Sequence, residues 1–251
     1  MRVRLSAIVL TKNEERNIVE CLEGLRWADE ILVLDSGSED TTVPLAGSLG
    51  ARVERRPFDN YPRQRNAALE LAQGQWAFFV DADERVDEGL AEEAQEAIGR
   101  GEEVGFWIPR RNYIFGRWIR HAGWYPDYQL RLFRRDRGRY DERREVHELV
   151  LLDGPAGYLE NPLIHYNYDN LAQFIERQER YTQIEAEYLY REGTRAKARS
   201  VLVQPWREFW RRYISLSGYR DGAYGLLLSL LMGYYEGVKY LKLRRLQRKG
   251  S

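Results

Sequence analysis

The first third of the chain alternates short apolar runs with stretches whose apolar residues recur at helical spacing. The predicted strands are residues 5–10, 30–34, 52–54 and 76–80, with helical stretches between them. Strands that alternate with helices form a mostly parallel sheet with helices on both faces. The alternation therefore predicts an α/β, Rossmann-like fold, in which ligands bind beyond the carboxyl ends of the strands.

The pattern is looser after residue 84. A helix is predicted at 87–98, strands at 104–109 and 130–133, and a long helix at 170–192. An arginine- and aromatic-rich stretch separates the two strands, and we find no internal repeat and no low-complexity linker. We divide the chain into residues 1–168, which hold the sheet, and a helical C-terminal region at 169–251.

Composition narrows the class of protein. The chain has 251 residues, of which 43% are hydrophobic and 13% aromatic, and this is enough to bury a sizeable core. Its single cysteine, Cys21, excludes a disulfide framework. The apolar run near the N-terminus is too short for the h-region of an export signal. We therefore expect a cytoplasmic protein.

Charge is unevenly distributed, although 39 Lys and Arg balance 39 Asp and Glu. Residues 191–251 carry 14 basic residues against 4 acidic ones, a net charge of +10, so residues 1–190 have a net charge of −10. Within that acidic part, residues 110–144 carry 11 arginines against 4 acids, a net charge of +7. Basic segments on an acidic body are usually directed at the phosphates of lipids or nucleic acids.

Polar side chains follow three of the predicted strands at their carboxyl ends. Asp81 and Asp83 follow the fourth strand, Asp35 follows the second, and residues 11–14 (TKNE) follow the first. Two carboxylates one residue apart can hold a hard divalent cation that also binds substrate phosphates. Each loop alone is better explained by a turn or a helix cap. Together, at one edge of a sheet, they favour a nucleotide site.

Four segments occur in order within roughly residues 4–85: SAIVLTKNEERNI, VLDSGSEDTT, RQRNAALELAQGQW and FFVDADE. In these segments the sequence resembles the family 2 glycosyltransferases with the GT-A fold. A weaker likeness continues through WYPDYQLRLFRR and VHE. Within the family the chain is most similar to the bacterial lipopolysaccharide core enzymes, whose arginine-rich middle and DGAYGLLLSLL tail look alike.

The resemblance implies an inverting transfer of a sugar from a nucleotide diphosphate donor, usually a UDP-hexose such as UDP-glucose, with Mg²⁺ or Mn²⁺. Residues 1–168 would then be the nucleotide-sugar-binding and catalytic domain. Carried over residue by residue, the likeness assigns nucleotide contacts to Thr11, Asn13, Glu14, Asp35, Arg65 and Asp81, and the principal metal contact to Asp83. A solvated helix face explains Arg65 about equally well.

An inverting transfer needs a base that takes the proton of the acceptor hydroxyl. Family members usually place this acid well after the metal motif, often in a Glu-Asp pair, and the matching pair here is His147-Glu148. We predict Glu148 as the base, with His147 orienting it or the acceptor. Glu145 and Asp127 are rivals, and an ordinary surface ion pair is the alternative for Glu148.

Two further groups have chemistry that suits the reaction. His165 follows a short apolar run and either completes the metal shell, touches the diphosphate, or is a buried core histidine. Trp124, Tyr125 and Arg120 are candidates for acceptor binding, because aromatic faces suit sugar rings and guanidinium groups suit phosphates or carboxylates. Half-buried packing is the alternative. The net charge of the surrounding segment suits an anionic saccharide or glycolipid acceptor.

Residues 223–235 form an uncharged apolar run that is too short to span a bilayer. Basic residues flank it on both sides, so we predict a helix that lies in the headgroup plane at the inner face of the cytoplasmic membrane. A buried core helix, or a helix at the interface of a homo-oligomer, is the alternative.

Two other function classes explain part of the sequence. A nucleotidyltransferase shares the carboxylates, metal and nucleotide, but TKNEERN lacks the glycines of a phosphate loop. A non-catalytic lipid- or nucleic-acid-binding module explains the basic tail but not the acidic strand ends, because carboxylates repel phosphates unless a metal intervenes. We therefore predict a metal-dependent inverting glycosyltransferase that binds no nucleic acid.

Overall fold

A computed structural model describes residues 4–143 and 149–249, and the chain forms two compact units. The first unit contains the residues up to Arg110 together with Asp127–His165, and the second contains Arg111–Pro126 together with the residues from Tyr166 onward. The segment 111–126 thus packs with the C-terminal helices, although it lies far from them in the sequence. The domain boundary after residue 168 stays a prediction.

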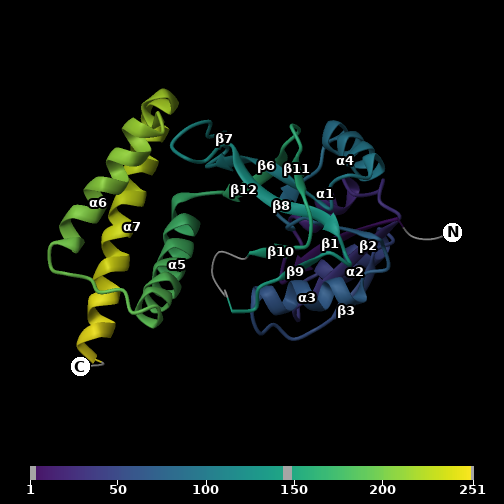
Figure 1. Ribbon diagram of the computed structural model, residues 1–251, viewed down its shortest axis with the longest axis horizontal. Helices are drawn as coiled ribbons and strands as arrows, with labels where there is room; N and C mark the ends of the chain where they lie inside the picture. The colour runs from purple at the N-terminus through teal and green to yellow at the C-terminus, as the bar shows by residue number, and fades with distance from the viewer. Residues whose placement is uncertain (1–3, 144–148, 250–251) are drawn as a thin grey trace. The chain divides into compact units, whose positions relative to one another are not determined.

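A mixed, mostly parallel sheet forms the centre of the first unit (Figure 1). Its strand order is β3-β2-β1-β4-β8-β6-β12-β5, with β7 and β11 paired to β6, and β9 and β10 form a separate pair. The strands are β1 (Leu5–Thr11), β2 (Glu30–Asp35), β3 (Arg52–Arg55), β4 (Trp76–Phe79), β5 (Glu84–Arg85), β6 (Gly105–Ile114), β7 (Arg117–Trp118), β8 (Asp127–Arg134), β9 (Gly138–Tyr140), β10 (Val150–Leu152), β11 (Ala156–Tyr158) and β12 (Leu163–Tyr168).

Helices cover both faces of this sheet because successive residues of a strand point to opposite sides. On β1, Val9 packs into one core cluster with α1 (Ile18–Glu23), α2 (Thr42–Ser48) and α4 (Glu88–Arg100). The neighbouring Ile8 packs into the other cluster.

The other face is covered by α3 (Tyr61–Leu71), which contributes Ala68 and Leu69 to the second cluster. In Figure 1, α3 lies on the opposite side of the sheet from α4. The predicted α/β fold is confirmed, and the four N-terminal strands lie within about a residue of their predicted positions.

The second unit is mainly helical. It contains α5 (Leu171–Arg191), α6 (Ser200–Trp210) and α7 (Gly222–Lys249), with the short turns η1 (Arg211–Ser215) and η2 (Gly218–Asp221) between α6 and α7. Its core includes Phe174 of α5 and Leu228 and Tyr235 of α7. Within the described ranges, no helix is both long and apolar enough to cross a membrane.

The helices α6 and α7 run antiparallel and pack closely at two glycines of α7. A Cβ atom on Gly233 would lie 2.9 Å from the Pro205 carbonyl oxygen, and one on Gly237 would lie 2.9 Å from Pro205 Cγ. Gly233 also faces Phe209, whereas Gly237 also faces Val201. The predicted apolar run at 223–235 is therefore part of a longer helix, and five of its residues are buried.

Candidate functional site

The carboxyl ends of β1, β2 and β4 meet at one edge of the sheet. Thr11, the last residue of β1, pairs in parallel register with Asp35, the last residue of β2. On the other side of β1, Ile8 pairs with Phe79 of β4, and Asp81 follows two residues later. The strand pairing therefore brings the three polar loops to one edge of the sheet, as predicted.

Asp35 shapes the loop that follows β2. Its buried carboxylate accepts hydrogen bonds from the backbone N–H groups of Gly37 (2.9 Å) and Ser38 (3.0 Å) and from the Ser38 hydroxyl. The Thr11 hydroxyl lies 3.3 Å from the same carboxylate. Gly37 has a φ of +86°, a conformation that glycine adopts at little cost. This network holds the loop in a turn.

The loop after β1 is hydrogen-bonded to the loop after β2. Asn13 donates its backbone N–H to the Ser38 hydroxyl (2.9 Å), and its side-chain oxygen accepts from the Glu39 N–H (2.9 Å). The Glu14 backbone N–H donates to the Thr42 hydroxyl (2.7 Å). The predicted nucleotide contacts Thr11, Asn13, Glu14 and Asp35 thus belong to one connected pair of loops.

Arg65 and Arg131 hold the carboxylate of Asp81. An Arg65 guanidinium nitrogen lies 3.0 Å from Asp81 Oδ1, and Arg131 contacts both carboxylate oxygens. Burial alone would raise the pKa of the Asp81 carboxyl, but the two guanidinium groups outweigh it and hold that pKa far below its usual range. Asp81 is therefore ionised and already paired.

Arg65 is buried, so the solvated helix face that the sequence allowed for it is wrong. Its guanidinium carbon lies 5.4 Å from the centre of the Phe79 ring and 5.5 Å from that of Tyr140. Guanidinium groups are attracted to aromatic faces at such distances. Arg65 therefore sits in a fixed position at the carboxyl end of β4.

Arg131 and Arg110 are site residues that the sequence analysis did not select. Arg131 lies 3.3 Å from an oxygen of Glu84, which is fully buried, and Arg110 lies 3.7 Å from the same oxygen. The sequence does contain a signal for Arg131: a charged residue inside the apolar strand run LRLF. A charged residue is rarely buried without a partner. The partners of Arg131 here are Asp81 and Glu84.

Asp83 and His165 lie side by side, as metal ligands would. The pairing of β5 with β12 places His165 opposite Glu84, and this brings His165 Nε2 to 3.6 Å from Asp83 Oδ2. Their side chains are only 18% and 9% exposed, respectively. Two residues that are far apart in the sequence thus present one carboxylate and one imidazole at the same point.

This donor pair fits Mn²⁺ better than Mg²⁺. Both cations take carboxylate oxygens and complete their shell with water and substrate phosphates, but imidazole is a ligand of transition metals rather than of Mg²⁺. Asp81 does not add to the set, because two arginines already pair with it. Among residues 4–143 and 149–249, no three His, Cys, Asp or Glu side chains gather into a metal cluster. Asp83 and His165 are therefore the two described side chains that we assign as candidate ligands.

The predicted base lies outside the part of the chain that the structure describes. His147 and Glu148, and the rival Glu145, lie outside the described residues, so their roles stay predictions. The other rival, Asp127, pairs with Arg110 through its Oδ2, at 2.9 Å from Arg110 Nε.

The predicted acceptor residues belong to the second unit. Two guanidinium groups lie close to the Trp118 ring, with Arg120 Cζ 4.2 Å and Arg111 Cζ 4.7 Å from its centre. Tyr125 packs edge-on against Trp118, with 5.6 Å between ring centres. Trp124 packs beneath Arg212, whose Cζ lies 5.3 Å from its ring. Trp124, Tyr125 and Arg120 are thus part of an arginine-aromatic cluster.

Asp221 fixes the loop that carries Arg120. Its buried carboxylate accepts the backbone N–H groups of Arg120 (3.3 Å) and His121 (2.8 Å) and lies 3.1 Å from His121 Nδ1. Asp221 lies 100 residues after His121, at the end of η2, and no local sequence pattern indicates this contact.

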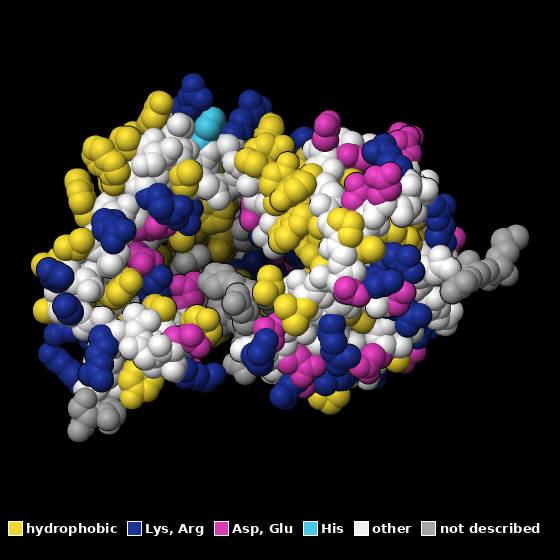
Figure 2. Space-filling model, viewed as in Figure 1, with side chains coloured by type: hydrophobic (Ala, Val, Ile, Leu, Met, Phe, Trp, Pro, Cys, Tyr) yellow, Lys and Arg dark blue, Asp and Glu magenta, His cyan; other side chains and the backbone are white. Residues whose placement is uncertain are grey.

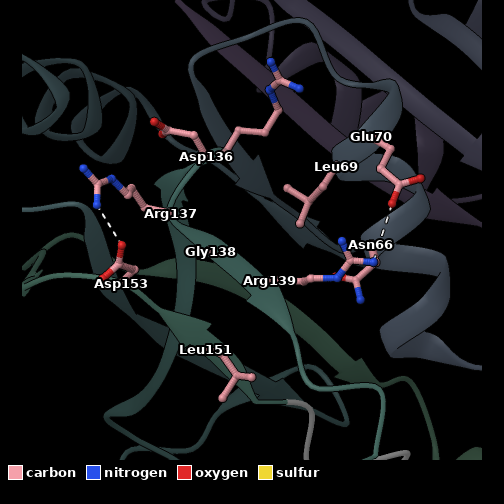
Figure 3. A pocket seen from close by; sticks show the side chains of 10 residues that line it. Asn66, Leu69, Glu70, Asp136, Arg137, Gly138, Arg139, Leu151 and Asp153 are labelled. Carbon is pink, nitrogen blue, oxygen red and sulfur yellow. Dashed lines mark hydrogen bonds and ion pairs between the residues drawn. The ribbon is translucent and has the colours of Figure 1, made fainter.

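A cavity of about 400 Å³ lies elsewhere in the first unit, beside α3 and β9 (Figure 3). Its walls carry charged side chains that pair with one another, including Arg137 with Asp153 at 2.7 Å and Arg139 with Glu70 at 3.6 Å. None of the predicted site residues lines it. We assign it no role.

Comparisons with known proteins bear on this site. The family described as glycosyl transferase family 2 matches residues 6–151. The lipopolysaccharide core biosynthesis glycosyltransferase LpsC of Rhizobium meliloti is 30% identical over 93% of this chain and 89% of its own length.

Two solved structures share the fold. The mannosyltransferase PcManGT of Pyrobaculum calidifontis, in complex with GDP-Man and Mn²⁺, has a TM-score of 0.57 at 16% identity and covers 97% of this chain and 86% of its own. TarS 1-349 of S. aureus, in complex with UDP-GlcNAc, has a TM-score of 0.53 at 14% identity and covers 99% of this chain and 92% of its own. At these identities the likeness is evidence for the fold.

Proposed function

Because the chain belongs to glycosyl transferase family 2, whose members use nucleotide-diphospho-sugars, we propose that it transfers glucose from UDP-glucose with inversion at the anomeric carbon. The acceptor that we propose is an anionic, lipid-linked saccharide such as the lipopolysaccharide core. The observation that carries the proposal is the approach of His165 to Asp83 beside the carboxyl ends of β1, β2 and β4.

On the donor side, the connected loops after β1 and β2 form the walls for the base and ribose. Thr11, Asn13, Glu14 and Asp35 are the contacts that we propose there, while Arg65 and the ionised Asp81 border the same edge of the sheet. Because these groups are already hydrogen-bonded to one another, little side-chain freedom is lost when the donor binds.

Asp83 and His165 would hold Mg²⁺ or Mn²⁺ against the donor diphosphate. When bound there, the cation supplies positive charge that stabilises the departing UDP. The two side chains are nearly buried and contact each other, so they hold their positions before the donor arrives.

On the acceptor side, we propose that Glu148 takes the proton of the acceptor hydroxyl while that oxygen attacks the anomeric carbon. The new glycosidic bond forms as the bond to the UDP oxygen breaks, so the configuration inverts. His147 would orient Glu148 or the acceptor. The arginine-aromatic cluster of Trp118, Arg120 and Tyr125 is chemically suited to a sugar ring that carries phosphates or carboxylates.

The name of the R. meliloti relative and the basic tail support a place for this reaction on the inner face of the cytoplasmic membrane. A nucleotidyltransferase and a non-catalytic binding module, the two alternatives that the sequence left open, do not agree with the family to which the chain belongs.

The test measures UDP release from UDP-glucose with Mn²⁺, with and without lipopolysaccharide-core acceptor, for the wild type and Asp83→Ala. Asp169→Ala is the matched control, because it removes an exposed carboxylate at the other end of β12. We expect loss of turnover for Asp83→Ala alone. Full activity in that variant would refute the metal role of Asp83. A panel of other nucleotide sugars tests the donor, and turnover with one of them instead would correct the choice of glucose.

A further inference from the structure

The outer face of α6 carries exposed apolar side chains at every fourth position. Leu202, Trp206 and Trp210 are 78%, 65% and 53% exposed, and no residue of α6 is buried. Residues four apart lie on the same face of a helix. Single exposed apolar residues are common, but two such tryptophans on one stripe indicate a surface that contacts something.

The helix α7 carries a second stripe of this kind. Leu226, Leu230 and Tyr234 are exposed and also recur at every fourth position. Each follows by one position a small, buried residue of α7, namely Gly225, Ser229 and Gly233. The last of these glycines lies against α6.

The two stripes lie on the same side of the helix pair. On α6, Leu202, Trp206 and Trp210 follow by one position the residues that contact α7, which are Val201, Pro205 and Phe209. One position is a rotation of about 100° in the same helical sense. In an antiparallel pair, residues that follow the contact residues by one position point to the same side on both helices. The stripes therefore form one apolar face, called here the α6–α7 face.

Basic residues gather at one end of this face. Residues 193–207 and 237–249 together contain 10 Lys and Arg and no Asp or Glu. The two segments lie at the same end of the helix pair, where the Gln247 amide donates to the Thr194 carbonyl oxygen at 2.7 Å. Lys239 and Lys242 pair with acids of α5, whereas Arg199, Arg207, Arg245 and Arg248 are exposed. Figure 2 shows hydrophobic and basic side chains side by side over α6 and α7.

We propose that the α6–α7 face is the element that docks this protein on an anionic lipid bilayer, with Trp206 and Trp210 at the headgroup level. A second copy of this chain would bring the same excess of basic residues against this face and be repelled, whereas an anionic bilayer attracts Lys and Arg and suits helices that combine them with Trp and Leu. The charge around the face therefore favours a lipid surface over a second protein. This inference names the contact surface for the membrane location in the proposed function and rests on that location, not on the donor or the acceptor.

The first test is co-sedimentation of the full chain with vesicles of phosphatidylethanolamine and phosphatidylglycerol at low salt, compared with phosphatidylcholine vesicles. We expect binding to the anionic vesicles, a decrease of about tenfold or more for Trp206→Ala with Trp210→Ala, and weakening by salt. The matched control compares single variants, Trp206→Ala and Tyr158→Ala. Both side chains are 65% exposed, but Tyr158 lies on β11 of the first unit. Tyr158→Ala should bind like the wild type.

The second test reports insertion directly. A polarity-sensitive dye on Leu202→Cys should shift to shorter wavelength when anionic vesicles are added, whereas the same dye on Tyr158→Cys should not. The native Cys21 is buried, which raises the pKa of its thiol, so the dye should react with the introduced cysteine.

Two results would overturn the inference. One is a wild type that stays in the supernatant with anionic vesicles. The other is a lipid-independent dimer, seen by sedimentation velocity, that Trp206→Ala with Trp210→Ala dissociates, because the face is then a protein interface. UDP release measured without vesicles separates this inference from the proposed function. A protein that binds vesicles but does not release UDP would refute only the proposed function. A protein that releases UDP but does not bind vesicles would refute only the membrane-docking inference.

Discussion

His165 Nε2 lies 3.6 Å from Asp83 Oδ2, although the two residues are 82 positions apart in the sequence. The contact follows from the antiparallel pairing of β12 with β5, which sets His165 opposite Glu84. Strand β12 thereby places His165 beside the acidic residues that follow β4. The pair is the part of the site that most directly suits a divalent cation.

The first prediction concerns this pair. His165→Ala should raise the Mn²⁺ concentration needed for half-maximal UDP release by about tenfold or more, because removal of a group that merely supports a ligand already costs about 10–100-fold. His121→Ala is the matched control, since His121 contacts Asp221 in the second unit. An unchanged Mn²⁺ dependence in His165→Ala would show that His165 is not a ligand.

The second prediction concerns Arg131, which contacts both Asp81 and Glu84. Arg131→Met leaves two acids without their shared partner in a buried setting, so the free energy of unfolding should fall by about 3–5 kcal/mol. Arg134→Met is the control, because Arg134 forms an exposed pair with Asp136 and its loss should change stability by less than about 0.5 kcal/mol. Urea unfolding of both variants provides the measurement. Equal stability of the two would mean that Arg131 contributes little.

The same residue shows what the sequence could and could not predict. The strands β1 to β4 follow from local periodicity, and the acids at the ends of β2 and β4 are read directly from the sequence, so both were predicted. The contact of Arg131 with Asp81 was missed because β8 pairs antiparallel with β4 across some 50 residues, and no local pattern encodes that register. The segment 111–126 follows the first sheet strands in the sequence, but it clusters with the residues from Tyr166 onward, and no local pattern predicts that grouping.

Asp35 was predicted as a nucleotide contact from the resemblance, and that role stays a prediction. What the structure adds is that its carboxylate accepts three hydrogen bonds from Gly37 and Ser38. A side chain that anchors a loop and one that touches a ligand have the same sequence signal, an acid at a strand end. Only the hydrogen-bond partners distinguish them.

The third prediction concerns pH and Glu208 on α6. Burial raises the pKa of this carboxyl, but hydrogen bonds and charge from Arg211 and Arg212 outweigh it, so the pKa is lowered overall. A folded-state pKa below the unfolded value, about 4.3 for Glu, stabilises the fold above that value. The contribution is then lost as the pH falls toward the folded-state pKa.

Glu208→Gln should therefore lower the unfolding free energy by about 1 kcal/mol at pH 7. The difference between wild type and variant should shrink as the pH falls through about 5 to 3. Urea unfolding across this range provides the measurement, with Glu96→Gln as the control, because Glu96 forms an exposed pair with Arg100. A difference that does not change with pH would contradict the role of the Glu208 charge.

The fourth prediction concerns the crossing of α6 and α7. Replacing glycine by alanine inside an open helix usually stabilises it by about 0.5–1 kcal/mol, because the unfolded chain loses freedom. Gly47 of α2 has open space where a Cβ would be added, so Gly47→Ala should follow this rule. At Gly233 the added Cβ would lie 2.9 Å from the Pro205 carbonyl oxygen, on backbone that cannot rotate away.

Gly233→Ala should consequently destabilise the second unit by about 1–3 kcal/mol, the usual cost of overpacking, so that the two identical substitutions have opposite signs. Thermal unfolding followed by circular dichroism compares them directly. Because the crossing also sets the position of Trp206 and Trp210, Gly233→Ala should weaken vesicle binding while Gly47→Ala should not. If Gly233→Ala were as stabilising as Gly47→Ala, the close packing of α6 on α7 would be wrong, and the single apolar face built on it would be lost too.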